Sequence, residues 1–139
     1  MSLSLADRVE ALARAYAHIA ATRMAGLPLV HPRLAVATVG FRPLDDDVAL
    51  GVLVTPWCMN LVRLPLQDGV AMLAVGQAGA RDIGARRFDF IGARESGVGA
   101  FEAASLFSPM AEFADQPAAL ATAEEVLKEL PYPKSRGCS

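Results

Sequence analysis

The sequence predicts an α+β domain, with an antiparallel sheet of about five to six strands and an N-terminal and a C-terminal helix packed on it. Apolar residues recur at helical three- and four-residue steps near both ends of the chain. Between these regions, short β-type runs alternate with turn signals such as Asp68-Gly69. The order helix, strands, helix favours both helices on one face of the sheet. We expect a single domain over residues 1–131.

The first expected element is an amphipathic helix over residues 5–25. Ser4 is a suitable N-cap, because its hydroxyl accepts a hydrogen bond from an otherwise unpaired N–H of the first turn. Gly26 and Pro28 mark the end of the helix. Its apolar seam comprises Leu5, Val9, Leu12, Tyr16 and Ile19.

The middle of the chain reads as strands separated by turns and loops. Strands are expected over residues 35–42, 48–54, 61–64, 86–91 and 103–107. Residues 43–47 form the first hairpin turn, and residues 70–75 either extend the third strand or return beside it. Residues 76–84 and 92–99, which are rich in glycine, read as loops.

A second helix follows the last strand. Asp115 is expected at its N-cap and Pro117 near its first position, where a missing N–H costs nothing. Its apolar face comprises Leu120, Ala123, Val126, Leu127 and Leu130, and Pro131 ends it. Residues 132–139 are expected to form a disordered tail.

Charge and cysteine content restrict the class of protein. A net charge of −2 with no clustered basic face argues against nucleic-acid binding. The two cysteines, Cys58 and Cys138, lack metal or redox spacing and suit a reducing compartment. The acidic residues Asp7 and Glu10 interrupt the N-terminus, so it does not read as a signal peptide, and no apolar stretch is long enough to span a membrane. We expect a soluble, cytoplasmic protein.

No catalytic or metal-binding constellation is evident. The run Asp45-Asp46-Asp47 lacks the spacing of a calcium loop and is better explained as a solvated turn. His18 and His31 are too isolated for a metal cluster. Cys58 has no neighbouring base in the sequence that would activate its thiol. A role without catalysis, cofactor or metal follows by elimination.

The most informative segment is Gly51–Pro65, where Thr-Pro-Trp separates two apolar runs. Proline lacks the N–H that a central strand donates, so the chain is expected to bend here. The bend brings Trp57, Cys58, Met59 and Asn60 together at a corner. On spacing alone, a tryptophan packed into the core at a strand bend explains the pattern better than a binding surface does.

Three blocks resemble the HybE/HupJ-type nickel–iron hydrogenase assembly chaperones. The corner resembles the family element that reads TPW-F-MNL-LP, with Cys58 in the position of its phenylalanine. Residues 104–110 (ASLFSPM) resemble its CSLFSPM element, with Ala104 in the position of its cysteine. Residues 22–28 (TRMAGLP), followed by Pro32 and Leu34, resemble the linker after its first helix. The blocks keep the family's order, and the resemblance spans about residues 5–130.

The resemblance implies a chaperone that binds immature hydrogenase subunits in the cytoplasm while metal cofactors are installed. The implied partners are the large-subunit precursor, the small subunit with its twin-arginine signal peptide, or both. Such a surface needs flexible apolar side chains and an aromatic anchor. The candidate partner-binding residues are therefore Trp57, Met59, Asn60, Phe107, Ser108 and Met110.

Two alternatives remain open from the sequence. One is a small-ligand-binding or thiol-dependent enzyme domain with Cys58 near a pocket. The other is a self-associating protein that pairs through its N-terminal helix seam, which Leu12→Asp or Tyr16→Asp is expected to disrupt.

Overall fold

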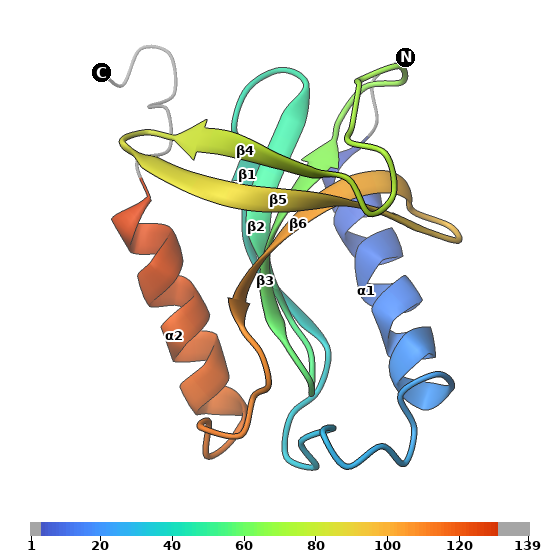
Figure 1. The fold of residues 1–139 in the computed structure, drawn as a ribbon, viewed down its shortest axis with the longest axis vertical. Helices are drawn as coiled ribbons and strands as arrows, with labels where there is room; N and C mark the ends of the chain where they lie inside the picture. Colours follow the sequence, from blue (N-terminus) through green and yellow to red (C-terminus); the bar gives the residue numbers. More distant parts are fainter. Residues whose placement is uncertain (1–3, 131–139) are drawn as a thin grey trace.

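The structure, a computed structural model, describes residues 4–130 and confirms the α+β fold (Figure 1). A single six-stranded antiparallel sheet has the strand order β1-β2-β3-β6-β5-β4. Its elements are α1 (Leu5–Ala21), β1 (Ala37–Pro43), β2 (Val48–Val54), β3 (Met59–Pro65), β4 (Ala78–Ile83), β5 (Arg86–Glu95), β6 (Gly99–Phe107) and α2 (Gln116–Glu129). The expected tail over 132–139 lies outside the described residues. Neither α1 nor α2 has the length and apolar character that a membrane crossing requires.

The two helices lie on opposite faces of the sheet, so the expectation that they share one face is wrong (Figure 1). Leu12 of α1 belongs to a buried cluster with Leu53 of β2. Leu127 of α2 belongs to a second cluster with Val52 of β2. Every residue of β2 is buried, because its alternate side chains enter the two clusters in turn. The uninterrupted apolar run Val48–Val54 is the sequence pattern of a strand covered on both faces.

Strand β2 has the expected bounds, but both expected loops contain strands. β4 lies within residues 76–84, and β5 and β6 continue through most of 92–99. Alanine and glycine have low β propensity, so these segments give little local signal. Their strand structure comes from pairing with a neighbour, as in the ladder of β4 with β5. Residues 70–75 form no strand of their own apart from one isolated bridge at Val75.

The helix termini follow the expected capping chemistry. The Ser4 hydroxyl accepts the N–H of Asp7, and Asp115 accepts the N–H of Ala118. The first helix ends at Ala21 rather than near residue 25. The Thr22 hydroxyl donates to the carbonyl of His18 at 2.6 Å, and the backbone leaves helical geometry at Thr22. Residues 22–25, which were expected to continue the helix, therefore begin the linker.

A loop over residues 66–77, here called the strap, covers part of the sheet that α2 leaves free. The strap packs so closely on Gly92 of β5 that a Cβ there would lie 2.1 Å from the carbonyl oxygen of Ala74. Gly76 donates its N–H to the Gly92 carbonyl at 2.9 Å. Leu73 donates its N–H to the Glu102 carboxylate at 2.8 Å. The strap is therefore held to β5 and β6 by backbone contacts.

Glu102 of β6 is the fully buried charge beneath the strap. Its carboxylate accepts hydrogen bonds from Arg63 of β3, from Arg81 of β4 at 2.8 and 3.2 Å, and from the Leu73 N–H. Burial alone raises the pKa of Glu102, but these donors outweigh it and hold the pKa below its usual value. The buried carboxylate of Glu102 thus joins β3, β4, β6 and the strap through hydrogen bonds.

A candidate protein-binding surface

The three sequence blocks converge at one end of the sheet, here called the loop end. It consists of the linker 22–34, the turn 55–58 between β2 and β3, and the segment 107–113 after β6 (Figure 1). The His31 N–H donates to the Pro56 carbonyl at 2.8 Å, and its ring Nε2 donates to the Phe113 carbonyl at 2.7 Å. His31 therefore ties all three segments together.

Thr55 builds the corner that presents the tryptophan. Its hydroxyl oxygen accepts the N–H groups of Trp57 and Cys58 at 3.2 and 2.9 Å, and its O–H donates to the Cys58 carbonyl at 3.0 Å. Thr55 itself is fully buried, so water does not compete for these bonds. The bend expected at Pro56 is therefore a tight turn held by one side chain.

The turn places Trp57 on the α1 side of the sheet. Its indole is half-buried and stacks on Tyr16 of α1, with ring centroids 6.5 Å apart and planes at 27°. Tyr16 also meets Phe101 of β6 edge-on at 6.4 Å. Burial raises the pKa of Tyr16 to about 12, with nearby Glu95 and Cys58 adding to the effect. A rigid, partly exposed indole at a loop is a suitable anchor for a protein partner.

Phe107 lies on the α2 side. It meets Phe113 edge-on at 5.1 Å and packs against the buried cluster of that face. Ser108 is exposed, and Asn60 is partly exposed near the start of β3. Trp57 and Phe107 therefore approach the loop end from opposite faces of the sheet and do not form one continuous patch.

Met59 and Met110 have no accessible surface and belong to the buried cluster beneath α2. In this conformation they offer nothing for a partner to contact, and they shape the core under the loop end. Of the six candidate residues, Trp57, Asn60, Phe107 and Ser108 reach the surface.

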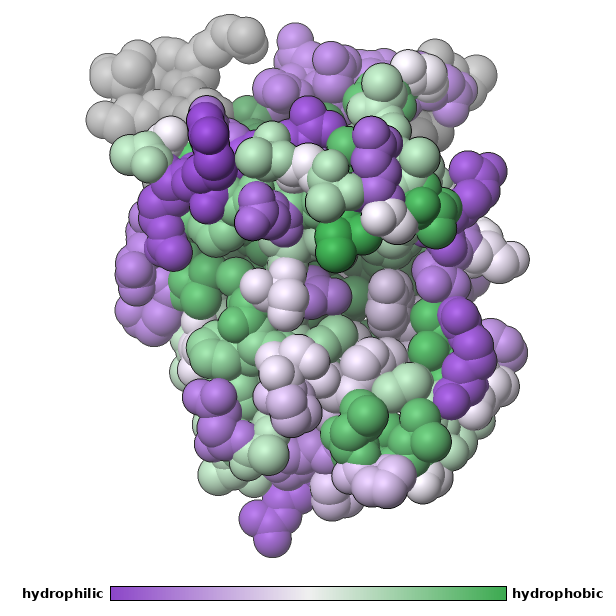
Figure 2. All heavy atoms as spheres, viewed as in Figure 1, coloured by the Kyte–Doolittle hydropathy of each residue, from purple (hydrophilic) through white to green (hydrophobic). Residues whose placement is uncertain are grey.

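Sequence reasoning missed two residues of this surface, Leu27 and Leu29. They are 41% and 49% exposed, which is high for leucine. Gly26, with φ of +77°, turns the chain out of α1 and into this segment. Figure 2 shows hydrophobic side chains exposed at the lower end of the molecule, where Figure 1 places the linker. The available signal was an apolar pair interrupted by Pro28 and bounded by Gly26 and Pro32, because prolines at this spacing prevent a regular helix or central strand from burying the two leucines.

Cys58 is half-buried beside Thr55, whose Oγ1 lies 3.3 Å from the thiol sulfur. Burial raises the pKa of the Cys58 thiol despite hydrogen bonds from Thr55 and Asn60. A thiol held in its protonated form is a poor nucleophile. The geometry therefore favours a packing role for Cys58. Cys138 lies outside the described residues.

The acidic run at the first hairpin is a structural turn. Asp45 accepts the N–H groups of Asp47 and Val48 at 2.8 and 2.9 Å, which fixes the β1–β2 connection. Within residues 4–130, no group of three or more histidine, cysteine or acidic side chains is placed to hold a metal ion.

The domain thus combines a half-exposed aromatic corner and an exposed apolar linker at one end of an antiparallel sheet, which makes the loop end the candidate surface for a protein partner. Residues 7–136 match the family described as [NiFe]-hydrogenase assembly, chaperone, HybE, and the chain belongs to that family. It is 43% identical to Protein HoxT of Cupriavidus necator over 89% of this chain and 75% of that protein. It is 40% identical to the hydrogenase expression/formation protein HupT of Azotobacter chroococcum, over 82% of this chain and 76% of HupT.

The fold also matches a solved structure. The solution structure of HybE from Escherichia coli superimposes with a TM-score of 0.72 at 17% identity, covering 100% of this chain and 89% of that one. The resemblance to this family is therefore confirmed, and so is the α+β fold expected from the sequence.

Proposed function

We propose that the chain binds immature nickel–iron hydrogenase subunits in the cytoplasm and delays their assembly or export until maturation is complete. The partners are the large-subunit precursor, the small subunit with its twin-arginine signal peptide, or both. The chain catalyses no reaction in this role. The observation that carries the proposal is the convergence at the loop end of all three blocks shared with the assembly chaperones.

The loop end has the physical properties that such binding needs. Trp57 is held rigidly by the Thr55 turn and by Tyr16, so docking on it costs little side-chain entropy. Leu27 and Leu29 supply exposed apolar area on the linker, which the His31 N–H fixes to the carbonyl of Pro56. Phe107 and Ser108 offer a separate contact on the α2 side of the loop end. We assign partner contact to these residues and Asn60.

The test is capture of separately expressed hydrogenase subunits by the tagged chain. The small subunit is supplied with and without its signal peptide, which separates recognition of the peptide from recognition of the mature fold. We expect capture of at least one precursor by the wild-type chain. Failure to capture either subunit would overturn the proposal.

Two double variants locate the contact. Leu27→Ser/Leu29→Ser removes exposed apolar area at the loop end, and Val75→Ser/Ile91→Ser removes exposed apolar area elsewhere. We expect the first to lose capture and the second to retain it, with unchanged melting temperature in both. Trp57→Ala is run in parallel, with its circular dichroism spectrum as the check that it folds. Equal loss in both double variants would contradict the assignment to the loop end.

A further inference from the structure

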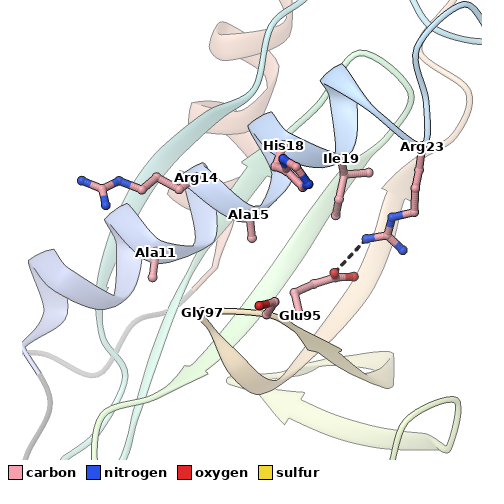
Figure 3. Close-up of a pocket in the computed structure, with 9 residues that line it drawn as sticks. Ala11, Arg14, Ala15, His18, Ile19, Arg23, Glu95 and Gly97 are labelled. Atoms are coloured by element: carbon pink, nitrogen blue, oxygen red, sulfur yellow. Dashed lines mark hydrogen bonds and ion pairs between the residues drawn. The ribbon is translucent and has the colours of Figure 1, made fainter.

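A groove runs between α1 and the turn of the β5–β6 hairpin (Figure 3). It has a volume of about 400 Å³. Ala11, Ala15 and Ile19 of α1 face Gly97 across it, and the small side chains leave room between helix and hairpin. Gly97 lies in open space, because a Cβ built there meets nothing within 4 Å. The groove can therefore receive a side chain from another molecule without rearrangement of its own floor.

The rim of the groove carries more positive than negative charge. Arg14, His18 and Arg23 lie on one side, and Glu95 is the carboxylate on the other. The Arg23 Nη2 donates to the Glu95 Oε1 at 2.8 Å. The Arg23 side chain is 64% exposed and that of Glu95 only 22%. A guanidinium has five N–H donors, and the bond to Glu95 uses one of them, so Arg23 retains donors for an incoming carboxylate.

The other arginine of the rim, Arg14, lies farther out. Figure 3 shows Arg23 reaching down toward Glu95, whereas Arg14 points away from the hairpin. Arg14 is paired with Glu10 at 3.5 Å in an exposed i,i+4 contact that contributes little energy. Among the residues that line the groove the two arginines outnumber the one carboxylate, and Glu10, which pairs with Arg14, lies outside the lining, so Arg23 is the cation that can receive a ligand carboxylate. Charge complementarity therefore selects an acidic ligand.

The groove adjoins the loop end. Arg23 belongs to the linker that carries Leu27 and Leu29, and the neighbouring Tyr16 of α1 stacks on Trp57. Arg23 and Glu95 lie close enough to Tyr16 to affect its pKa, so a polypeptide that covers Trp57 can also reach Arg23. A free small anion gains nothing from the apolar floor at Ala11 and Ala15, whereas a peptide with alternating acidic and apolar side chains uses both features.

We infer that this groove binds an acidic polypeptide segment of the captured subunit, with a partner carboxylate on Arg23 and an apolar side chain against Ala11, Ala15 and Gly97. The inference rests on the proposed function for the identity of the partner. The groove itself can be tested independently of that identity.

The first experiment measures precursor binding by two matched charge reversals. Arg14→Glu/Arg23→Glu alters the groove, and Arg86→Glu/Arg87→Glu alters the β4–β5 turn, where both arginines also form surface ion pairs. We expect the groove variant to raise the Kd by roughly tenfold or more at low salt, with a weaker salt dependence. The control pair leaves Kd within about twofold. Equal Kd values for the groove variant and wild type would overturn the inference and leave the proposed function intact.

The second experiment uses a synthetic peptide of four Leu-Glu repeats and follows backbone amide shifts by NMR. We expect saturable shifts at Ala11, Ala15 and Gly97, which a Leu-Lys peptide of the same length does not produce. Absence of these shifts with the Leu-Glu peptide would overturn the inference even where precursor capture succeeds. Identical shifts with acetate alone at matched carboxylate concentration would assign the groove to a bare anion and overturn the polypeptide assignment. If neither subunit is captured, the proposed function fails. The NMR titration with the Leu-Glu peptide then decides by itself whether the groove binds an acidic polypeptide.

Discussion

At the scale of single residues, Glu102 shows how the chain tolerates a charge with no accessible surface. Moving a carboxylate out of water is costly, and the cost is offset only when charged donors satisfy its oxygens. Arg63, Arg81 and the Leu73 N–H supply those donors. Arg63 also lies over the ring of Phe90, 5.9 Å from its centroid. The centre therefore links β3, β4, β6 and the strap.

The first prediction concerns the loss of this charge. Glu102→Gln keeps the shape of the side chain but leaves two guanidinium groups without their carboxylate. We expect the free energy of unfolding to fall by about 3 kcal/mol, because breaking a buried ion pair on one side leaves uncompensated charge. Urea denaturation measures the change. Glu124→Gln, at an exposed position of α2, is the matched control. Equal midpoints for the two variants would contradict a stabilising role for the Glu102 centre.

The lowered pKa of Glu102 sets the pH dependence of that difference. The pKa of a glutamate side chain in an unfolded chain is about 4.3, and the pKa of Glu102 in the folded chain lies below its usual value. Its ionised form therefore contributes stability above the unfolded pKa, and this contribution is lost as the pH falls through the folded pKa. We expect the stability gap between wild type and Glu102→Gln to be constant near neutrality and to narrow below about pH 4. A gap that widens on acidification would reverse the assigned direction of the pKa shift.

The raised pKa of Cys58 predicts slow alkylation. Because burial raises the pKa of the folded thiol, a smaller fraction of it is thiolate at a given pH, so iodoacetamide should label Cys58 more slowly in the folded chain than in urea at the same pH. Mass spectrometry of the labelled peptide separates Cys58 from Cys138. We expect Cys58→Ser to retain subunit capture. Rapid labelling of the folded chain at neutral pH would revive the thiol-dependent alternative.

At the scale of elements, strands with strong local patterns were predictable and those stabilised by neighbours were not. Val48–Val54 is a continuous apolar run, and its bounds were read directly from the sequence. Ala78–Ile83 combines small and charged residues, and its strand conformation depends on pairing with β5. The corner at Pro56 was predictable because proline limits the backbone. The exposure of Leu27 and Leu29 was not, since it depends on how His31 anchors the linker.

The strap offers a prediction at this scale. A Cβ at Gly92 would lie 2.4 Å from the Leu73 carbonyl oxygen and 2.1 Å from that of Ala74. Backbone atoms cannot rotate away as a side chain can, so Gly92→Ala should lift the strap from β5. We expect faster hydrogen exchange at the Leu73 N–H and a lower melting temperature. Gly97→Ala is the control, because it adds backbone strain of about 1 kcal/mol without a steric contact. Unchanged exchange at Leu73 in Gly92→Ala would show that the strap is not held by this contact.

At the scale of the whole molecule, the two-sided sheet determines what each helix does. With one helix on each face, β2 becomes the shared floor of both clusters. The uninterrupted apolar run of β2 was the sequence signal for a sheet covered on both faces. The order of elements along the chain, however, does not say which face each helix covers. That choice depends on the path of the linkers, and the 15 residues between α1 and β1 allow either. Loss of α1 should therefore expose the cluster that contains Leu12, and loss of α2 should expose the part of the other face that the strap does not cover.

The last prediction separates this architecture from self-association through the helix seam. Leu12 of α1 has no accessible surface and packs in the same buried cluster as Leu53 of β2. Ala123 of α2 also has no accessible surface and packs in the cluster on the other face of the sheet. An unpaired carboxylate at either position is buried at a cost of several kcal/mol, a large share of the stability of a small domain. We expect Leu12→Asp and Ala123→Asp to unfold the chain or lower its melting temperature by more than about 10 °C.

The controls are Ala17→Asp and Ala121→Asp, at exposed positions of the same two helices. We expect both to melt within a few degrees of wild type, since surface substitutions rarely change stability by more than about 0.5 kcal/mol. Circular dichroism gives the melting temperature, and light scattering after size exclusion gives the mass. If Leu12→Asp instead yields a folded monomer from a larger wild-type species, the α1 seam is an interface between copies. If the wild-type chain has the mass of a monomer and Leu12→Asp unfolds it, Leu12 belongs to the core of a single chain. The carboxylate then disrupts the packing that holds α1 on the sheet.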